Sequence, residues 1–222
     1  MYKQLFDPKR IELNVDNIIL IPDFRAKKYY RNLKNNALKK ISLIGNDILI
    51  FNNFALITGF LGYSNLLLTL EFIEDIKQKD IFFLGTGGVL KKNIKVPCSL
   101  NVIEIYSSSI FKLFSKKRSF DLNDFVSGNI KKVKGVSVDL IQRETKKWLR
   151  EQLIEEIDIV DMELFPLRVY LKKPFYALII STDIVKPGGI EPFFNNDLIK
   201  KEFVKSYKLI KRHIDEKKSS IN

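Results

Sequence analysis

The sequence predicts an α/β fold, a single domain over residues 1–222 in which three αβα layers are built on a mixed central sheet. Two observations predict it. Apolar runs of strand length alternate along the chain with longer segments whose apolar residues have helical spacing. In addition, Gly45-Asn46-Asp47 separates two apolar runs and is a strong hairpin signal, which adds an antiparallel pair to the sheet. No internal repeat and no linker-like stretch divides the chain.

The expected strands of the N-terminal half are short apolar runs bounded by turn residues. They are Asn17–Pro22, Ile41–Ile44, Ile48–Phe51, Phe54–Thr58 and Asp80–Leu84. A helical segment that runs to about Leu33 follows the first strand. After the turn Gly59-Phe60-Leu61-Gly62, Ser64 is expected to cap a helix that ends near Ile76. Gly85-Thr86-Gly87-Gly88 is expected to form the turn that ends the last of these strands.

The C-terminal half continues the alternation. Its expected strands are Asn101–Tyr106, Ile130–Val138 and Tyr176–Ile180. The polar stretch Ser115–Asn129 is expected to be a loop or lid, and Glu144–Ile157 has the apolar spacing of an amphipathic helix. Asn196 is expected to cap a final helix. One face of that helix carries Ile199, Phe203, Tyr207, Ile210 and Ile214.

Composition and charge argue against several classes of protein. The apolar runs are far shorter than the roughly 20 residues that cross a bilayer, and the first residues, MYKQLFDPKR, lack a hydrophobic signal region. The single cysteine, Cys98, fits a reducing compartment, so we expect a cytoplasmic protein without a membrane partner. The net charge is +12, but the lysines are scattered and the densest basic run is only Lys116-Lys117-Arg118. Nucleic-acid binding is therefore kept as an alternative and is not the expected function.

Two short acidic segments carry the most chemistry. Val160-Asp161-Met162-Glu163 follows an apolar run, and Ser181-Thr182-Asp183 follows the apolar strand Tyr176–Ile180, one helix and one strand later. Ligands of α/β sheets bind at the carboxyl ends of strands, so we expect both segments to face one pocket. The chain has no cluster of His, Cys and carboxylate residues with metal-ligand spacing, and no metal is expected.

Six motifs, in the right order, make the chain resemble a divergent member of the nucleoside phosphorylase and nucleosidase family, which includes purine nucleoside phosphorylases, uridine phosphorylases and methylthioadenosine nucleosidases. They are similar to that family's first strand and phosphate loop, its TGxGxPS turn, its RxGTxGG segment, its strand into the base pocket, and its VEME and VSD signatures. The six segments are Ile19–Lys27, Thr58–Ser64, Phe83–Gly88, Gly135–Leu140, Val160–Glu163 and Ser181–Asp183.

The resemblance implies that the chain cleaves the N-glycosidic bond of a purine nucleoside. Asp183 would protonate the leaving base, and we expect its pocket to raise its pKa. Glu163 would accept hydrogen bonds from ribose hydroxyls, and Met162 would pack against the ribose face. Further residues that the resemblance places in the ribose and base pocket are Asp161, Ile141 and Thr182.

The resemblance also implies phosphorolysis, with inorganic phosphate as co-substrate and no cofactor. Arg25, Thr86 and Gly85 are the candidate phosphate-binding residues. Phe83, however, stands where phosphorylases have a second phosphate-binding arginine, and the loop Pro22–Arg25 is shorter than the family's. The departures from the family's motifs therefore fall mainly at the phosphate-binding positions, whereas the residues expected to bind ribose and base are present.

Two other functions therefore stay open: a phosphate-independent nucleosidase and a catalytically impaired relative that binds nucleosides. Nucleosidases of the family carry a glutamate after the first strand to activate water, and Asp23 is the candidate at that place. The resemblance further implies a homo-oligomer, a dimer or a trimer of dimers, in which a neighbouring chain completes each pocket.

Overall fold

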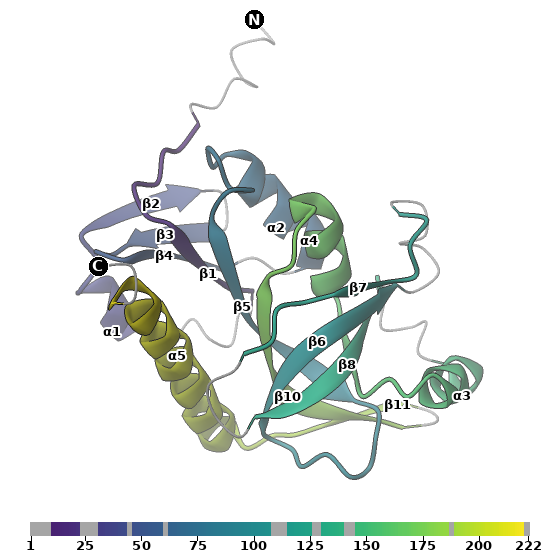
Figure 1. Ribbon diagram of the computed structural model, residues 1–222. Coiled ribbons are helices and arrows are strands. Elements are labelled where there is room, and N and C mark those ends of the chain that lie inside the picture. Colours follow the sequence, from purple (N-terminus) through teal and green to yellow (C-terminus); the bar gives the residue numbers. More distant parts are fainter. Residues whose placement is uncertain are drawn as a thin grey trace, which may run out of the picture.

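The computed structural model describes residues 10–22, 31–43, 46–59, 62–107, 115–125, 130–139, 145–186 and 189–219. Within them the strands are β1 (Asn17–Ile21), β2 (Lys39–Leu43), β3 (Asn46–Ile50), β4 (Phe54–Thr58), β5 (Asp80–Val89), β6 (Ser99–Ser107), β7 (Ser119–Asp121), β8 (Lys131–Ser137), β9 (Ile159–Asp161), β10 (Tyr176–Lys186) and β11 (Gly189–Pro192). The helices are α1 (Arg31–Lys34), α2 (Gly62–Glu71), α3 (Lys146–Ile154), α4 (Leu164–Leu171) and α5 (Asn196–Ser219). The predicted α/β class with a mixed sheet is confirmed (Figure 1).

One half of the sheet is built on β1, which pairs in parallel with β4 on one side and β5 on the other. β4 continues through antiparallel pairs to β3 and β2. The predicted hairpin is therefore confirmed as β2–β3, although its turn residues 44–45 lie outside the described residues. Buried β-branched and aliphatic side chains fill β1 and β4, as expected for strands covered on both faces.

The other half of the sheet closes on itself. β5 pairs with β10, β10 with β6, β6 with β8, β8 with β9, and β9 pairs back with β5. β11 extends the edge of β10, and β7 adds to β6. Closure removes the free edges that an open sheet would leave on these strands. The closed ring brings strands far apart in the sequence into contact with β5.

The helices cover the sheet from two sides, which gives the predicted three layers (Figure 1). α2 and α4 contribute Leu66, Leu70, Phe165 and other buried residues to one apolar cluster. α5 contributes a second cluster on the opposite side, while α3 packs through Leu149 against a third. The predicted apolar face of α5 is confirmed for four residues, which are Ile199, Phe203, Ile210 and Ile214; Tyr207 is half-buried.

Two strands continue past the points where the sequence predicts that they end. β5 runs through the Gly85–Gly88 segment to Val89, and β10 runs through Ser181–Asp183 to Lys186. The predicted turn is wrong because the glycine segment pairs with β10 and because β9 crosses it closely. A Cβ on Gly87 would lie 2.7 Å from the carbonyl oxygen of Val160, so glycine is needed there for close approach.

Other boundaries also differ from the predictions. α2 ends at Glu71, short of Ile76, and the predicted loop Ser115–Asn129 contains the short strand β7. The cap of α5 is Asn195, whose Oδ1 accepts the amide of Leu198 at 3.1 Å, because the helix begins one residue earlier than predicted. None of the helices in the described ranges is apolar over a long enough stretch to cross a bilayer.

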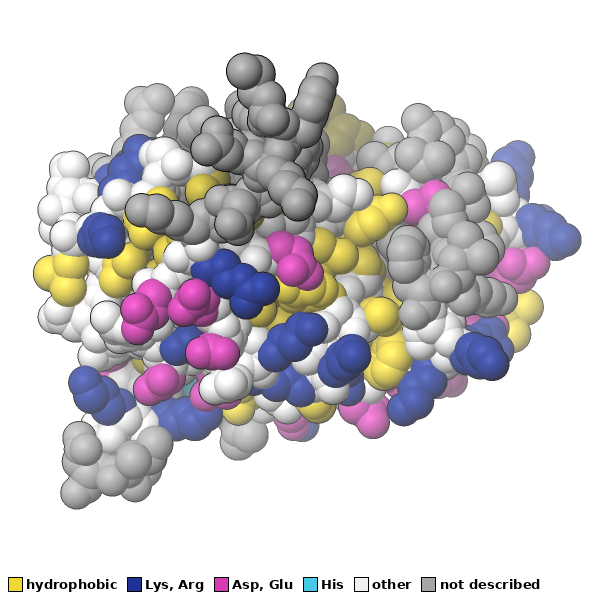
Figure 2. Space-filling view, turned by 90° about the horizontal axis from the view of Figure 1, so that it is seen from above, with side chains coloured by type: hydrophobic (Ala, Val, Ile, Leu, Met, Phe, Trp, Pro, Cys, Tyr) yellow, Lys and Arg dark blue, Asp and Glu magenta, His cyan; other side chains and the backbone are white. Residues whose placement is uncertain are grey.

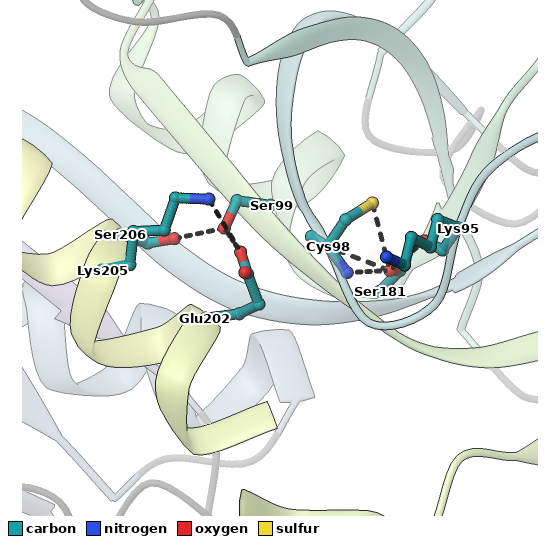
Figure 3. A network of polar contacts seen from close by, with 7 residues as sticks. All are labelled: Lys95, Cys98, Ser99, Ser181, Glu202, Lys205 and Ser206. Carbon is teal, nitrogen blue, oxygen red and sulfur yellow. Dashed lines mark hydrogen bonds and ion pairs between the residues drawn. The ribbon is translucent and has the colours of Figure 1, made fainter. Parts of the chain in front are cut away.

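Two buried serines connect the start of β6 and the middle of β10 to neighbouring segments (Figure 3). Ser99 at the start of β6 bonds to Glu202 at 2.8 Å and to Ser206 at 2.6 Å, both on α5. Ser181 in β10 accepts the amide of Cys98 at 2.8 Å through its hydroxyl, and its own amide donates to the carbonyl of Cys98 at 2.9 Å. The contacts of Ser181 hold β10, the strand that carries Asp183, against the segment just before β6.

The surface charge is interspersed on the face shown in Figure 2, where Lys and Arg side chains lie among acidic and apolar ones. Several lysines are paired, for example Lys34 with Asp47 at 2.6 Å and Lys91 with Asp158 at 2.8 Å. Interspersed charges of both signs are typical of a solvated surface.

Candidate active site

The two acidic segments lie on opposite sides of β5. In the β5–β10 pairing Asp183 is in register with Gly88, and in the β5–β9 pairing Val160 is in register with the same Gly88. Adjacent strands lie about 4.8 Å apart, so the two segments are separated by the width of β5. The structure therefore places the two acidic signatures on the two sides of the glycine segment, and a pocket that both of them face stays a prediction.

Asp161 ends β9 and lies inside the protein. Its carboxylate is 4% exposed; Oδ1 accepts the hydroxyl of Ser137 at 2.5 Å, and Oδ2 accepts the amides of Glu163 at 2.9 Å and Leu164 at 2.7 Å. Burial raises the pKa of Asp161 from its ordinary 3.8 to about 6, although these three hydrogen bonds favour the charged form. The carboxylate faces main-chain and side-chain donors of its own chain.

Glu163 occupies the N-cap position of α4 and is 7% exposed. The amide of Gly62, the first residue of α2, donates to Glu163 Oε1 at 3.1 Å. Gly62 has a φ of 74°, a left-handed conformation that glycine adopts without strain. The α2 N-terminus also favours a negative charge through the helix dipole. The TGxGxPS-like turn thus contacts the carboxylate that the resemblance assigns to ribose.

Met162 lies between the two acids and is half-exposed. It packs against the apolar cluster that contains Val136, Val160 and Val185. The chain therefore presents a thioether beside Glu163 on a supported apolar surface, where it can contact a sugar face.

Asp183 is half-buried and lies at an irregularity of β10. The register with β5 shifts between Ser181 and Asp183, as in a β-bulge, which re-aims side chains at this point of the strand. The hydroxyl of Thr182, which is 2% exposed, donates to Asp183 Oδ2 at 2.8 Å. The carbonyl of Thr182 accepts the amide of Phe193 from beyond β11 at 2.8 Å.

The predicted phosphate-binding residues fall in different places. Gly85 and Thr86 lie in β5, paired with Ile179 and Ile180 of β10, and Thr86 is half-buried. A Cβ on Gly85 would lie 2.5 Å from the ring of Phe83, because that ring is packed beside it in the core at 1% exposure. Three further residues named in the sequence analysis, Arg25, Ile141 and Asp23, lie outside the described residues.

Hollows lined by described residues occur elsewhere on the molecule. One of about 830 Å³ runs along the outward face of α5, past Lys201, Lys205 and Lys208. Another of about 410 Å³ lies beside Phe51 and Tyr207. Neither contains a residue of the candidate site, and their lining brings together no set of groups that performs bond cleavage.

Sequence reasoning assigned no role to Ser137, whose hydroxyl contacts both Asp161 and α4. It also predicted Asp161 to lie in the substrate pocket; in the structure its carboxylate accepts the main-chain amides of Glu163 and Leu164 at the start of α4. The partner Ser137 had no local signal, since β8 and β9 meet only in the folded chain.

No protein-family model matches the chain, and no curated protein matches it. Solved structures do match over nearly its whole length. A mutant of the Helicobacter pylori 5′-methylthioadenosine/S-adenosylhomocysteine nucleosidase, with 5′-methylthioadenosine in its active site, is 16% identical with a TM-score of 0.70, over 92% of this chain and 100% of that one. The futalosine hydrolase of the same organism is 18% identical with a TM-score of 0.70, over 91% and 98%.

A third match is the Campylobacter jejuni 5′-methylthioadenosine/S-adenosylhomocysteine nucleosidase, 14% identical with a TM-score of 0.69, over 92% of this chain and 100% of that one. At such identities the likeness establishes the fold and leaves the activity to be argued from the residues. The chain has the fold of these nucleosidases, as the resemblance in sequence motifs implied.

Proposed function

We propose that the chain is a nucleosidase that hydrolyses the N-glycosidic bond of a purine nucleoside. The observation that supports this most is the register of β5, in which Gly88 pairs with Asp183 on one side and with Val160, three residues before Glu163, on the other. In the reaction the bond between C1′ and the base nitrogen breaks, and a water oxygen bonds to C1′. The base leaves with a proton from Asp183, and water supplies the proton that restores the acid.

The carboxylate of Glu163 suits an acceptor of ribose hydroxyls, because it is held near the N-terminus of α2 at a fixed place. Orientation of the sugar is a large part of the catalytic effect in such a site. Asp183 suits the proton donor, because it is half-buried and bonded to a hydroxyl that can reorient.

Hydrolysis is favoured over phosphorolysis by the position of Phe83. Its ring lies in the core, so this position offers no cation to a phosphate. Two cationic contacts normally share the charge of a bound phosphate. The solved structures that match are named nucleosidases and a hydrolase, which supports the same preference. A 5′-methylthioadenosine-like purine nucleoside is the substrate class we propose.

The test is to incubate the purified chain with 5′-methylthioadenosine, S-adenosylhomocysteine, adenosine, inosine and uridine, with and without phosphate, and to follow the free base by chromatography. We expect release of adenine or another purine at the same rate in both conditions. Release that requires phosphate would establish a phosphorylase instead. Nucleoside binding by calorimetry without turnover would identify a binding protein on this scaffold and overturn the proposal.

A further inference from the structure

The start of α4 is clamped by two buried side chains that lie outside the helix. Asp161 accepts the amides of Glu163 and Leu164, and the hydroxyl of Ser137 accepts the amide of Phe165 at 2.8 Å. Pro166 has no amide hydrogen, and the amide of Leu167 bonds to the carbonyl of Glu163 at 3.0 Å. Every main-chain donor from 163 to 167 is therefore satisfied, and those of the first turn that lack an intrahelical partner are satisfied by Asp161 and Ser137.

The clamp is anchored on the sheet. Ser137 ends β8 and is in register with Asp161 at the end of β9. Their side chains bond to each other at 2.5 Å, and the amide of Val138 donates to the carbonyl of Asp161 at 2.8 Å. Ser137 is fully buried and Asp161 is 4% exposed. Three of the acceptor positions of the Asp161 carboxylate are thus occupied by groups of the protein itself.

Glu163 is the residue through which the clamp acts on the candidate site. Its amide is held by Asp161, its carbonyl accepts the amide of Leu167, and its carboxylate accepts the amide of Gly62. The amide and the carbonyl of Glu163 are thus both held by hydrogen bonds, which fixes the backbone from which its side chain extends. A shift of the first turn of α4 moves the carboxylate away from its place at the start of α2.

We propose that Ser137 and Asp161 are positioning residues that hold Glu163 in place for the ribose of the substrate. This inference rests on the proposed nucleosidase function. Glu163 touches the sugar in that scheme, while Ser137 and Asp161 act only through it. Of the two neighbouring acids, Glu163 therefore contacts the substrate and Asp161 positions Glu163.

The activity test compares Ser137→Ala with Ser206→Ala, a matched loss of a fully buried serine hydroxyl that bonds to another side chain at 2.6 Å. Each variant is assayed on a purine ribonucleoside and on its 2′,3′-dideoxy analogue, and kcat/KM is measured for both. We expect Ser137→Ala to lower kcat/KM for the ribonucleoside by about 10- to 100-fold and to reduce the preference over the analogue. Glu163→Gln should reduce that preference as well, and Ser206→Ala should leave it unchanged.

A merely structural role predicts a different result, because global destabilisation lowers both rates alike. An unchanged preference in Ser137→Ala would therefore overturn the proposal. Should that variant fail to fold, Asp161→Asn, which keeps the shape of the side chain, takes its place with the same expectation.

A second readout does not depend on turnover and separates this inference from the proposed function. Amide hydrogen exchange followed by nuclear magnetic resonance should be faster at both Phe165 and Gly62 in Ser137→Ala than in the unchanged chain. Faster exchange at Phe165 alone would show that the clamp does not reach the Glu163 carboxylate, and the inference would fall. Faster exchange at both amides in a protein that cleaves no nucleoside would support the positioning role of Ser137 and contradict the proposed nucleosidase function.

Discussion

The two acids of the candidate site are held by different kinds of donor. Glu163 bonds to a main-chain amide at the N-terminus of α2, and its own backbone is clamped at the start of α4. Asp183 lies at a register shift in β10 and bonds to the hydroxyl of its neighbour Thr182. A main-chain N–H can only donate a hydrogen bond, so it favours the charged carboxylate. A hydroxyl can donate to a carboxylate or accept from a carboxylic acid. The difference matches a fixed acceptor at one position and a proton-transfer group at the other.

The largest expected effect that tests this contrast comes from neutralising each acid. Asp183→Asn removes the proton donor, and we expect kcat on a purine nucleoside to fall by about 100-fold or more. Glu163→Gln keeps a hydrogen-bonding side chain but removes the negative charge. We expect this variant to have a higher KM and a weaker preference for ribose. Steady-state kinetics of the two variants check the contrast. Equal losses in kcat with unchanged KM for both would mean that the two acids do not have separate roles.

Asp161 is expected to make the free energy of unfolding depend on pH. The pKa of Asp161 is raised in the folded chain to about 6, so between about pH 4 and pH 6 the native state binds a proton that the unfolded state has lost. The stabilisation is full below the ordinary pKa of the group and is lost as pH rises through the folded value, by up to about 3 kcal/mol. Urea unfolding across this range measures it.

Asp161→Asn cannot titrate and should flatten this part of the stability curve. A variant curve that falls as steeply between pH 4 and pH 6 as that of the unchanged chain would assign the effect to another group.

The smallest expected effect is at Thr182. Thr182→Val removes the hydroxyl that bonds to Asp183 and keeps the branched shape, so the strand should pair as before. Loss of one such hydrogen bond is worth about 1 kcal/mol, which corresponds to a fall of roughly five- to tenfold in kcat/KM. Thr86→Val, a similar change in the neighbouring strand, is the comparison. A larger loss at Thr86 than at Thr182 would point to a ligand contact in β5, as the sequence analysis first proposed.

Much of the fold follows from local patterns in the sequence. Apolar runs bounded by turn residues identify β4 with its observed bounds and β3 closely, and spacing identifies the buried face of α5. These features depend on residues within a few positions of one another. The segments Val160–Glu163 and Ser181–Asp183 flank the same strand, because β9 and β10 both pair with β5 at Gly88.

The tertiary structure decided what depends on distant contacts. The glycine segment of β5 looks like a turn in the sequence, but the approach of Val160 and the pairing with β10 make it a strand. Glu163 meets Gly62 across 101 positions of sequence, and no local pattern specifies that pair. Asp161 bonds to Ser137 because the β8–β9 pairing places the two residues in register, and no local pattern specifies that pair either. Local spacing predicts many of the elements, whereas the pairing of distant strands decides which side chains contact other parts of the protein.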